Sequence, residues 1–312
     1  RRSVADELAR IDDPLLRAVL GARWADHGAP PEQAPFAEHA LVLGSFDAGA
    51  YFPIGGPARF AQTLVPTIEA AGGELRLACD VVRILTGSGR VTGVEYLHDG
   101  QHCSEPAQQV ISAMGVGNTV ACLDAADAAP WQETIRGLQP GLSYVSLYLG
   151  FEGDIAAAGA SSANHWIYES EDVGAVWCDP ADTDAPGIFV SFPSAKDPQE
   201  SAHPTAEVIA MVDGAAFAPW LRLPDGARPE EYLALKAWIE ERLLAQFLRH
   251  FPALKPLLRF HELSTPVTQR RYVRSPEGAM YGIEMSAQRL TSPALHVQIG
   301  RASCRERVYH PV

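Results

Sequence analysis

The stretch YFPIGGPARFAQTLVPTIEAAGGELRL, residues 51–77, decides how this chain is expected to fold. A glycine pair, Gly55 and Gly56, stands directly before a run with apolar residues at helical spacing, and a second glycine pair ends that run. Glycines ahead of a helix are typical of sites where backbone N–H groups approach a phosphate, and equally of plain turns. Because neither G-x-G-x-x-G nor G-x-x-x-x-G-K-[ST] occurs, the residues alone leave both interpretations open.

Short strands are predicted to follow this first helix. The pattern indicates a helix over 57–71, kinked at Pro66, and then strands at 73–77, 80–85, 90–97 and 107–115. The turns TGSG and HDG separate neighbouring strands at hairpin spacing. The pattern therefore predicts a β-meander, within a βαβ-like part around 49–125.

The chain changes character after Trp131. Strands are predicted at 141–151, 165–170, 187–193 and 256–266, and a long helix at 229–251. One apolar stripe follows that helix: Tyr232, Leu235, Ile239, Leu243 and Phe247. We therefore predict a second part, a mixed sheet plus helix, from about 126 to 290. A further helix is predicted over 3–23, with Ser3 and Asp6 as a capping pair.

Composition excludes several classes of protein. The 312 residues are 47% apolar and 20% charged, which is typical of a globular protein. A net charge of −13 argues against a nucleic-acid partner. We expect a cytoplasmic protein, because no apolar run is long enough to span a membrane and the first residues lack a secretory core. Apolar docking of one surface patch on a membrane stays open.

The chemistry-bearing residues alone indicate neither a hydrolase nor a metalloenzyme. The five cysteines show no C-x-x-C spacing, and no G-x-S-x-G turn occurs. His39, His165, His250 and His261 are scattered, so a structural role is the expectation for each.

Several blocks, taken in order, resemble one flavoenzyme family: the phytoene desaturases and the all-trans-retinol 13,14-reductases, or retinol saturases. Residues 49–77, the block DVVRILTGSGRVTGVEYLHDG (80–100) and the strand VISAMG (110–115) resemble three consecutive family segments. WADHGAPPEQAPFAEHALV (24–42), FVSFPSAKDP (189–198) and TPVTQRRYVRSPEGAMYGIE (265–284) favour the retinol-saturase-like branch. The resemblance is colinear over residues 13–298.

The resemblance implies an α/β fold in which a partial Rossmann-type FAD domain is interleaved with a substrate domain. Residues 1–48 are expected to be a helical part of the substrate domain, 49–125 the partial FAD domain and 126–290 the substrate domain. Residues 291–298 would begin the return to the FAD domain. The implied cofactor-binding residues are Gly55, Gly56, Val81, Ala113, Tyr281 and Gly282. A core position for the Tyr281 ring is the alternative, and no catalytic residue or metal ligand is identified.

Two family segments have no counterpart in this sequence. The dinucleotide fingerprint would precede residue 1, and a second flavin motif would follow SPALHVQ (292–298). Residues 299–312 instead read IGRASCRERVYHPV, which resembles a translated adapter end, so we expect a non-native tail; a divergent C-terminus is the alternative. We therefore expect the chain alone to be inactive.

The implied activity is FAD-dependent saturation or desaturation of carbon–carbon bonds in an apolar polyene or isoprenoid. Two alternatives remain: a non-catalytic fragment that holds a lipid, and a flavin amine oxidase. We predict that the apolar faces of SLYLGF (146–151) and FVSFP (189–193) line a long cavity bordered by Tyr281. The sequence leaves open the substrate's identity, the direction of the reaction, the electron partner and the oligomeric state.

Overall fold

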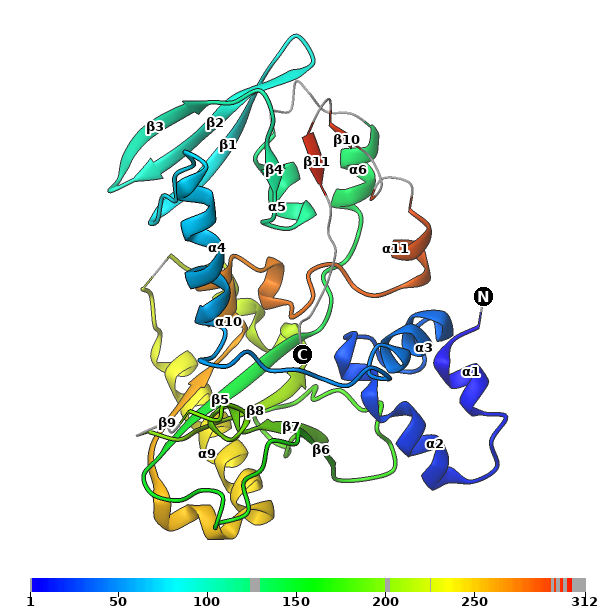
Figure 1. Cartoon of the computed structure of the whole chain (residues 1–312). Coiled ribbons are helices and arrows are strands. Elements are labelled where there is room, and N and C mark those ends of the chain that lie inside the picture. The colour runs from blue at the N-terminus through cyan, green and yellow to red at the C-terminus, as the bar shows by residue number, and fades with distance from the viewer. Residues whose placement is uncertain are drawn as a thin grey trace. The chain divides into compact units, whose positions relative to one another are not determined.

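The computed structural model describes residues 2–123, 130–199, 203–224, 226–292, 295, 298–299 and 302–304. The chain divides into two compact units. Unit 1 holds Arg1–Pro57 and Pro140–Ala287, and unit 2 holds Ala58–Gln139 and Gln288–Pro311. Each unit thus combines two separate stretches of chain, which confirms the interleaved α/β organisation (Figure 1). The boundaries predicted for the FAD and substrate domains stay predictions, because compactness does not show where a ligand binds.

Unit 1 is built on a five-stranded sheet with the order β6-β7-β8-β5-β9 (Figure 1). Its strands are β5 (Ser143–Phe151), β6 (His165–Tyr168), β7 (Gly187–Ser191), β8 (Thr205–Val212) and β9 (Leu258–Ser264). All four pairings are antiparallel, so the sheet that we predicted as mixed is antiparallel. The sequence patterns did not predict β8, although it lies in the centre of the sheet.

One face of this sheet packs against helix α9 (Glu230–His250). Alternate residues of β5 and β8, such as Leu147 and Val208, form one core cluster with Ile239, Leu243 and Phe247 of the helix. The predicted apolar stripe is confirmed, since its members are buried or packed against the core. Each fully buried Leu or Phe side chain contributes about 1.5–3 kcal/mol to the free energy of unfolding.

Shorter helices complete unit 1. They are α1 (Val4–Leu8), α2 (Pro14–Gly21), η1 (Ala22–Asp26), α3 (Phe36–Gly44), α7 (Pro193–Lys196), η3 (Gly214–Phe217), α8 (Ala218–Leu221), η4 (Pro252–Leu257), α10 (Pro266–Val273), η5 (Pro276–Gly278) and α11 (Ala287–Thr291), whose last residues belong to unit 2. The capping box of Ser3 and Asp6 is confirmed. The single helix predicted over 3–23 is wrong, because the Asp13 carboxylate caps a new helix through the N–H groups of Leu15 and Leu16.

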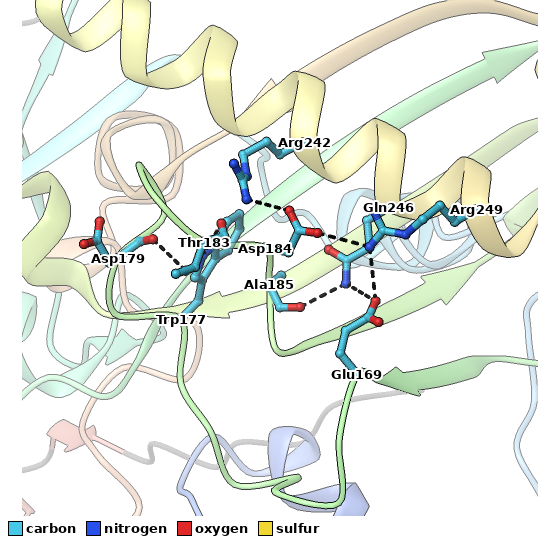
Figure 2. A network of polar contacts seen from close by, with 9 residues as sticks. All are labelled: Glu169, Trp177, Asp179, Thr183, Asp184, Ala185, Arg242, Gln246 and Arg249. Carbon is cyan, nitrogen blue, oxygen red and sulfur yellow. Dashed lines mark hydrogen bonds and ion pairs between the residues drawn. The ribbon is translucent and has the colours of Figure 1, made fainter.

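A polar network ties α9 to the connection between β6 and β7 (Figure 2). Gln246 Nε2 donates to Glu169 Oε1 at 2.8 Å and to the Ala185 carbonyl at 2.9 Å. Arg242 Nη2 and Arg249 Nη2 bind opposite oxygens of Asp184, at 2.8 and 3.2 Å. Since Gln246 is buried, loss of its hydrogen bonds leaves polar groups unsatisfied and loosens this connection.

Unit 2 contains a three-stranded meander, but its third strand lies at 101–106, and of the strand predicted at 107–115 only Ile111–Ser112 forms. Strands β1 (Cys79–Gly87), β2 (Arg90–His98) and β3 (Gln101–Pro106) pair antiparallel in that order. Its other elements are α4 (Ala58–Ala70, with Pro66 inside), α5 (Val116–Ala121), α6 (Pro130–Arg136), β4 (Ile111–Ser112), β10 (Gln298–Ile299) and β11 (Ala302–Cys304). Strand β11 pairs with β10 antiparallel and with β4 in parallel.

Two predictions about these strands have opposite outcomes. Val81 and Val145 lie in different sheets, so the separation predicted near Trp131 is confirmed. The strand predicted at 73–77 is wrong, since the segment forms no ladder and its apolar side chains Leu75 and Leu77 are exposed. None of the helices in the described part of the chain combines the length and the apolar character needed to cross a bilayer.

Candidate functional site

The second face of the unit 1 sheet, opposite α9, carries the candidate site. Side chains alternate along a strand, so residues that flank the core positions of β8 point to this face. Phe189 pairs with Ile209, and Ile209 pairs with Ser146. The next row in register is more polar, because Ser191 pairs with Glu207 and Glu207 pairs with Tyr148. An apolar row therefore lies beside a polar row, about 7 Å apart along the strands.

A cavity of about 120 Å³ opens on the apolar side of this face. Its lining residues are mainly apolar or aromatic: Trp24, Ala25, Asp26, Trp166, Tyr168, Ala175, Pro186, Gly187, Ile188, Phe189, Ile209, Met211, Met280 and Tyr281. The predictions about this cavity hold only in part. Phe189 and Tyr281 line it, whereas Leu147 and Leu149 of SLYLGF face α9 in the core.

Three of the aromatic lining residues have their polar atoms bonded to the backbone. Trp24 Nε1–H donates to the Val173 carbonyl, and the Tyr168 hydroxyl donates to the Ala22 carbonyl. The Tyr281 hydroxyl donates to the Ala25 carbonyl at 2.7 Å. Because these donors are already used, the rings are free to offer apolar surface to a ligand.

The one carboxylate among the described lining residues is neutralised. Asp26 Oδ2 lies 2.6 Å from Arg23 Nη2 in an ion pair. The Arg23 guanidinium also lies over the Trp166 ring, 5.7 Å from its centroid. Burial raises the pKa of Tyr281, and the nearby Asp26 charge acts in the same direction. The cavity therefore offers an apolar ligand a surface without an unpaired acid.

Gly28 allows the Tyr281 ring to reach this position. Its φ is +77°, and a Cβ added there would lie 2.3 Å from Tyr281 Cδ2. An alanine would meet both the strained backbone conformation and the ring, so only glycine fits. The close contact of Gly28 with the Tyr281 ring brings residues 24–28 and 280–281, which are far apart in sequence, to one wall of the cavity.

A buried histidine pair supports the loop before Gly28. His39 Nε2 lies 2.8 Å from the Leu20 carbonyl and must donate to it, which leaves His39 Nδ1 as an acceptor. His27 Nε2 therefore donates to His39 Nδ1 at 3.0 Å. Burial, with a smaller effect of His39, lowers the pKa of His27 to about 4. In the part of the chain that the structure describes, no three His, Cys, Asp or Glu side chains form a metal cage.

The predicted glycine turn is well defined and bound within unit 1. Gly55 and Gly56 have φ of +84° and +76°. The Gly55 N–H donates to Asp197 Oδ2 at 2.8 Å, and the Gly56 N–H donates to the Pro53 carbonyl at 2.9 Å. Both amides are used inside the chain, so neither is a free donor for a phosphate. Contact with a flavin through other atoms of this turn stays a prediction.

The remaining predicted cofactor residues fall in both units. Gly282 accepts a hydrogen bond from the Gly141 N–H at 2.8 Å in unit 1. Val81 is half-buried on β1 and Ala113 is exposed after β4, both in unit 2. The structure thus brings Tyr281 and Gly282 together in sequence and space, and the cofactor roles of all these residues stay predictions.

A polar cluster that the sequence did not single out lies at the end of the sheet face. Lys196 Nζ donates to Asn164 Oδ1 at 2.5 Å and to Ser191 Oγ at 2.8 Å. Ser146 Oγ donates to Glu207 Oε1 at 2.7 Å. Burial lowers the pKa of Lys196, and the Glu207 charge opposes that effect. The motif FPSAKDP contained the signal, because it supplies Lys196 as the last residue of α7, the helix that follows β7.

A second and larger hollow of about 720 Å³ lies elsewhere in unit 1. It is lined by polar and apolar groups from the segments 28–33, 140–143, 213–222 and 270–286. The charged residues among them are Asp213, Arg222, Arg270, Glu277 and Glu284. This mixed lining differs from that of the small cavity on the sheet face.

Sequence comparison relates the chain to polyene enzymes, although no protein-family model matches it. All-trans-retinol 13,14-reductases of Danio rerio and Homo sapiens are 28% and 27% identical to it, each over 93% of this chain and 50% of the relative. A chloroplastic prolycopene isomerase of Arabidopsis thaliana is 24% identical over 87% of this chain and 44% of its own length. The chain therefore spans about half the length of the curated relatives it matches.

Solved structures share the fold. An oxidoreductase from Methanosarcina mazei has a TM-score of 0.54 at 16% identity, covering 91% of this chain and 65% of that chain. Cyclohexylamine oxidase from Brevibacterium oxydans has a TM-score of 0.55 at 15% identity, covering 97% and 61%. At these identities the likeness establishes the fold alone. The chain is a homologue of the all-trans-retinol 13,14-reductases and prolycopene isomerases, and the resemblance to the retinol saturase and phytoene desaturase family is confirmed.

Proposed function

We propose that this chain supplies the substrate-binding part of an FAD-dependent oxidoreductase that saturates or desaturates carbon–carbon bonds of an apolar polyene or isoprenoid. The aromatic cavity on this sheet face carries the proposal, because the polar atoms of the Trp24, Tyr168 and Tyr281 rings are already bonded to the backbone. The named activities of the retinol reductases and prolycopene isomerases support the same substrate class.

The size of the cavity indicates how such a substrate would lie. Sites for small molecules commonly enclose about 300–1,000 Å³. The cavity here, about 120 Å³, would therefore enclose one end of a long ligand. The remainder would follow the sheet face from Phe189 and Ile209 toward the polar row at Ser191 and Glu207.

The described residues fit FAD only in part. Within unit 1, the Gly55–Gly56 turn and the Tyr281 ring offer turn and ring surfaces for a flavin nucleotide, whereas both turn amides are occupied and no phosphate loop occurs in the sequence. A bound flavin would supply hydride transfer to or from a substrate carbon. The part played by this chain's own residues is to orient the polyene and to keep water from it, through the rings of Trp24, Trp166 and Tyr281.

An amine substrate, the alternative, finds less support in the cavity. The likeness to cyclohexylamine oxidase concerns the fold. A protonated amine would need a free carboxylate or an exposed aromatic cage. Asp26 is bound to Arg23, and Arg23 already lies over the Trp166 ring, so a second cation there would be repelled.

Energy transfer from tryptophan to a polyene tests the proposal. Trp24 and Trp166 line the cavity, so titration with all-trans-retinol should quench tryptophan fluorescence in a saturable way. Phe189→Asp should weaken the binding at least tenfold, because it adds an unpaired charge to the apolar wall. Phe60→Asp on the exposed face of α4 is the matched control and should leave it unchanged. Competition by cyclohexylamine but not by a polyene hydrocarbon would favour the amine alternative.

The cofactor part of the proposal has a separate test. Isolated contacts of about 1 kcal/mol each do not overcome an association cost of at least about 4 kcal/mol. The chain mixed with FAD and desalted should therefore retain little flavin absorbance. A stoichiometric yellow complex would show that these residues form a complete flavin site.

We also propose peripheral contact with a membrane, where apolar polyenes dissolve. Leu15, Val19 and Leu41 on α2 and α3 are 62%, 61% and 70% exposed. In a flotation assay, the chain should rise with neutral phosphatidylcholine vesicles. The variant in which Leu15, Val19 and Leu41 are replaced by serine should remain in the bottom fraction. Equal flotation of both proteins would refute this contact.

A further inference from the structure

We propose that Lys196 and Glu207 form a receptor for a hydroxyl group at the polar end of the substrate, and that this pair selects alcohols over carboxylates and hydrocarbons. The inference rests on the proposed function and names the residues that set end-group specificity. The inference rests on two neighbouring rows of side chains on one sheet face, Phe189 with Ile209 and Ser191 with Glu207.

The polar cluster continues the apolar site in strand register. Ile209 belongs to the cavity lining, and Glu207 lies two residues along β8 on the same face. Phe189 and Ser191 have the same relation on β7, and the two pairs are cross-strand neighbours. A ligand with its apolar end in the cavity would thus reach Ser191 and Glu207 about 7 Å beyond Phe189 and Ile209.

Lys196 is held in place and has donor capacity left. Two of its three N–H groups bind Asn164 and Ser191, and its Nζ lies 5.9 Å from the centroid of the Phe52 ring. The next residue, Asp197, is fixed by the Gly55 N–H. No other acceptor for the Lys196 ammonium occurs among the residues that the structure describes, so one N–H can serve a ligand.

Glu207 provides the complementary acceptor. Its Oε1 accepts from the Ser146 hydroxyl, and among the described residues its carboxylate forms no ion pair within 4.0 Å. The Glu207 charge acts to raise the pKa of Lys196, against the larger effect of burial. Lys196 binds Ser191, whose cross-strand neighbour is Glu207, so a donor and an acceptor lie at the same row of the sheet.

This combination matches an alcohol. A hydroxyl oxygen can accept from Lys196 while its proton is donated to Glu207, which satisfies both charged groups. A carboxylate would gain from Lys196 but meet the like charge of Glu207. A hydrocarbon end would leave both ions desolvated without a partner, so it should bind least well.

Binding titrations with three matched probes test the proposal on the full chain. All-trans-retinol, its methyl ether and all-trans-retinoic acid share one polyene and differ in the end group. We expect the wild-type chain to bind the alcohol about tenfold more tightly than the ether or the acid, the value of one charge-assisted hydrogen bond.

The variants separate specificity from folding. Lys196→Met should weaken the binding of all three probes, because each end group has an oxygen that accepts from Lys196. Glu207→Gln should reduce the preference for alcohol over ether and bring the acid within about threefold of the alcohol. Glu207→Gln keeps the side-chain shape, so it is informative even if Lys196→Met unfolds. Lys255→Met, at an exposed lysine on η4, is the matched control and should change no ratio.

The outcomes distinguish the two proposals. If the wild-type chain binds all three probes with equal affinity, or if Glu207→Gln leaves the alcohol-to-acid ratio unchanged, the end-group receptor is wrong while the polyene site stands. If the wild-type chain binds none of the probes, the proposed function fails and the receptor fails with it.

Discussion

The two sheets of this chain differ in what their strands bury. The unit 1 sheet buries one whole face against α9, in a cluster of aromatic and aliphatic side chains that includes Leu147, Val208 and Phe247. In the described part of unit 2, the meander contributes only Ile84 and Val91 to a small cluster with Leu123. Strand pairing contributes little to the free energy of unfolding unless one face of the sheet is buried. We therefore expect unit 1 to contribute most of the stability.

The helices of the two units differ in the same way, because α4 of unit 2 is exposed where α9 of unit 1 is buried. Its apolar residues Phe60, Leu64 and Ile68 stand one turn apart and are 53%, 59% and 46% exposed. The sequence predicted a βαβ-like part around 49–125 that includes this helix, but the helix has no buried residue. An exposed apolar stripe of this kind favours self-association of the chain. The chain itself spans about half the length of its curated relatives.

Amide exchange should show the largest difference between the units. Amides of β5, β8 and the middle of α9 should open only with global unfolding, at several kcal/mol, whereas those of α4 should exchange at nearly zero opening free energy. Hydrogen–deuterium exchange with peptide mapping measures both in one sample. Equal protection of α4 and α9 would show that unit 2 has a core that burial does not reveal.

Truncating one leucine in each unit should have a smaller but clear effect. Leu243→Ala on α9 leaves a cavity at a fully buried site, so we expect a loss of about 2–5 kcal/mol in the free energy of unfolding. Leu64→Ala on α4 should change it by less than about 0.5 kcal/mol and should reduce aggregation. Urea unfolding and light scattering provide the measurements. A loss at Leu64 as large as that at Leu243 would contradict the comparison.

The sequence predicted well those elements that local patterns determine. The apolar stripe of α9, the long strand β5 and the hairpin turns of the meander each follow from the spacing of residues within one segment. The strand at 73–77 failed because alternation alone does not supply a partner strand. Strand β8 was missed because Val208, Met211 and Val212 are apolar on both faces, which blurs the alternation.

The candidate site depends more on distant contacts than on local pattern. The cavity position of Tyr281 could be predicted from its motif, but its bond to Ala25 and its contact with Gly28 join segments about 250 residues apart. The pairing of Ser191 with Glu207 is fixed by the register of β7 and β8, which no single segment encodes. The family resemblance therefore implied the substrate class, whereas the proposed polar receptor needed the structure.

Two glycines with similar positive φ test whether side-chain packing or backbone strain determines the cost of replacing a glycine by alanine. Gly28→Ala in unit 1 adds a clash with the Tyr281 ring to a positive φ, so we expect a loss of about 2–4 kcal/mol. Gly89→Ala, in the β1–β2 turn of unit 2, has φ of +73° with nothing within 4 Å and should cost about 1–2 kcal/mol. Thermal unfolding measures both. A larger loss for Gly89→Ala than for Gly28→Ala would show that the backbone conformation, and not the contact with Tyr281, determines the cost.

The last expected effect is a pH dependence that comes from His27 in unit 1. The pKa of His27 is lowered from 6.5 to about 4 in the fold, so between these values the unfolded chain binds more protons than the folded one. Its contribution is complete above about pH 6.5 and is lost as the pH falls toward 4. A proton would have to enter at His27 Nδ1, which is buried and has no hydrogen-bond partner among the described residues. We expect a loss of roughly 2 kcal/mol between pH 7 and pH 5, and His27→Gln, which cannot titrate, should flatten that slope. Urea unfolding at a series of pH values, followed by tryptophan fluorescence, measures it. An unchanged slope in His27→Gln would assign the acid sensitivity to other groups.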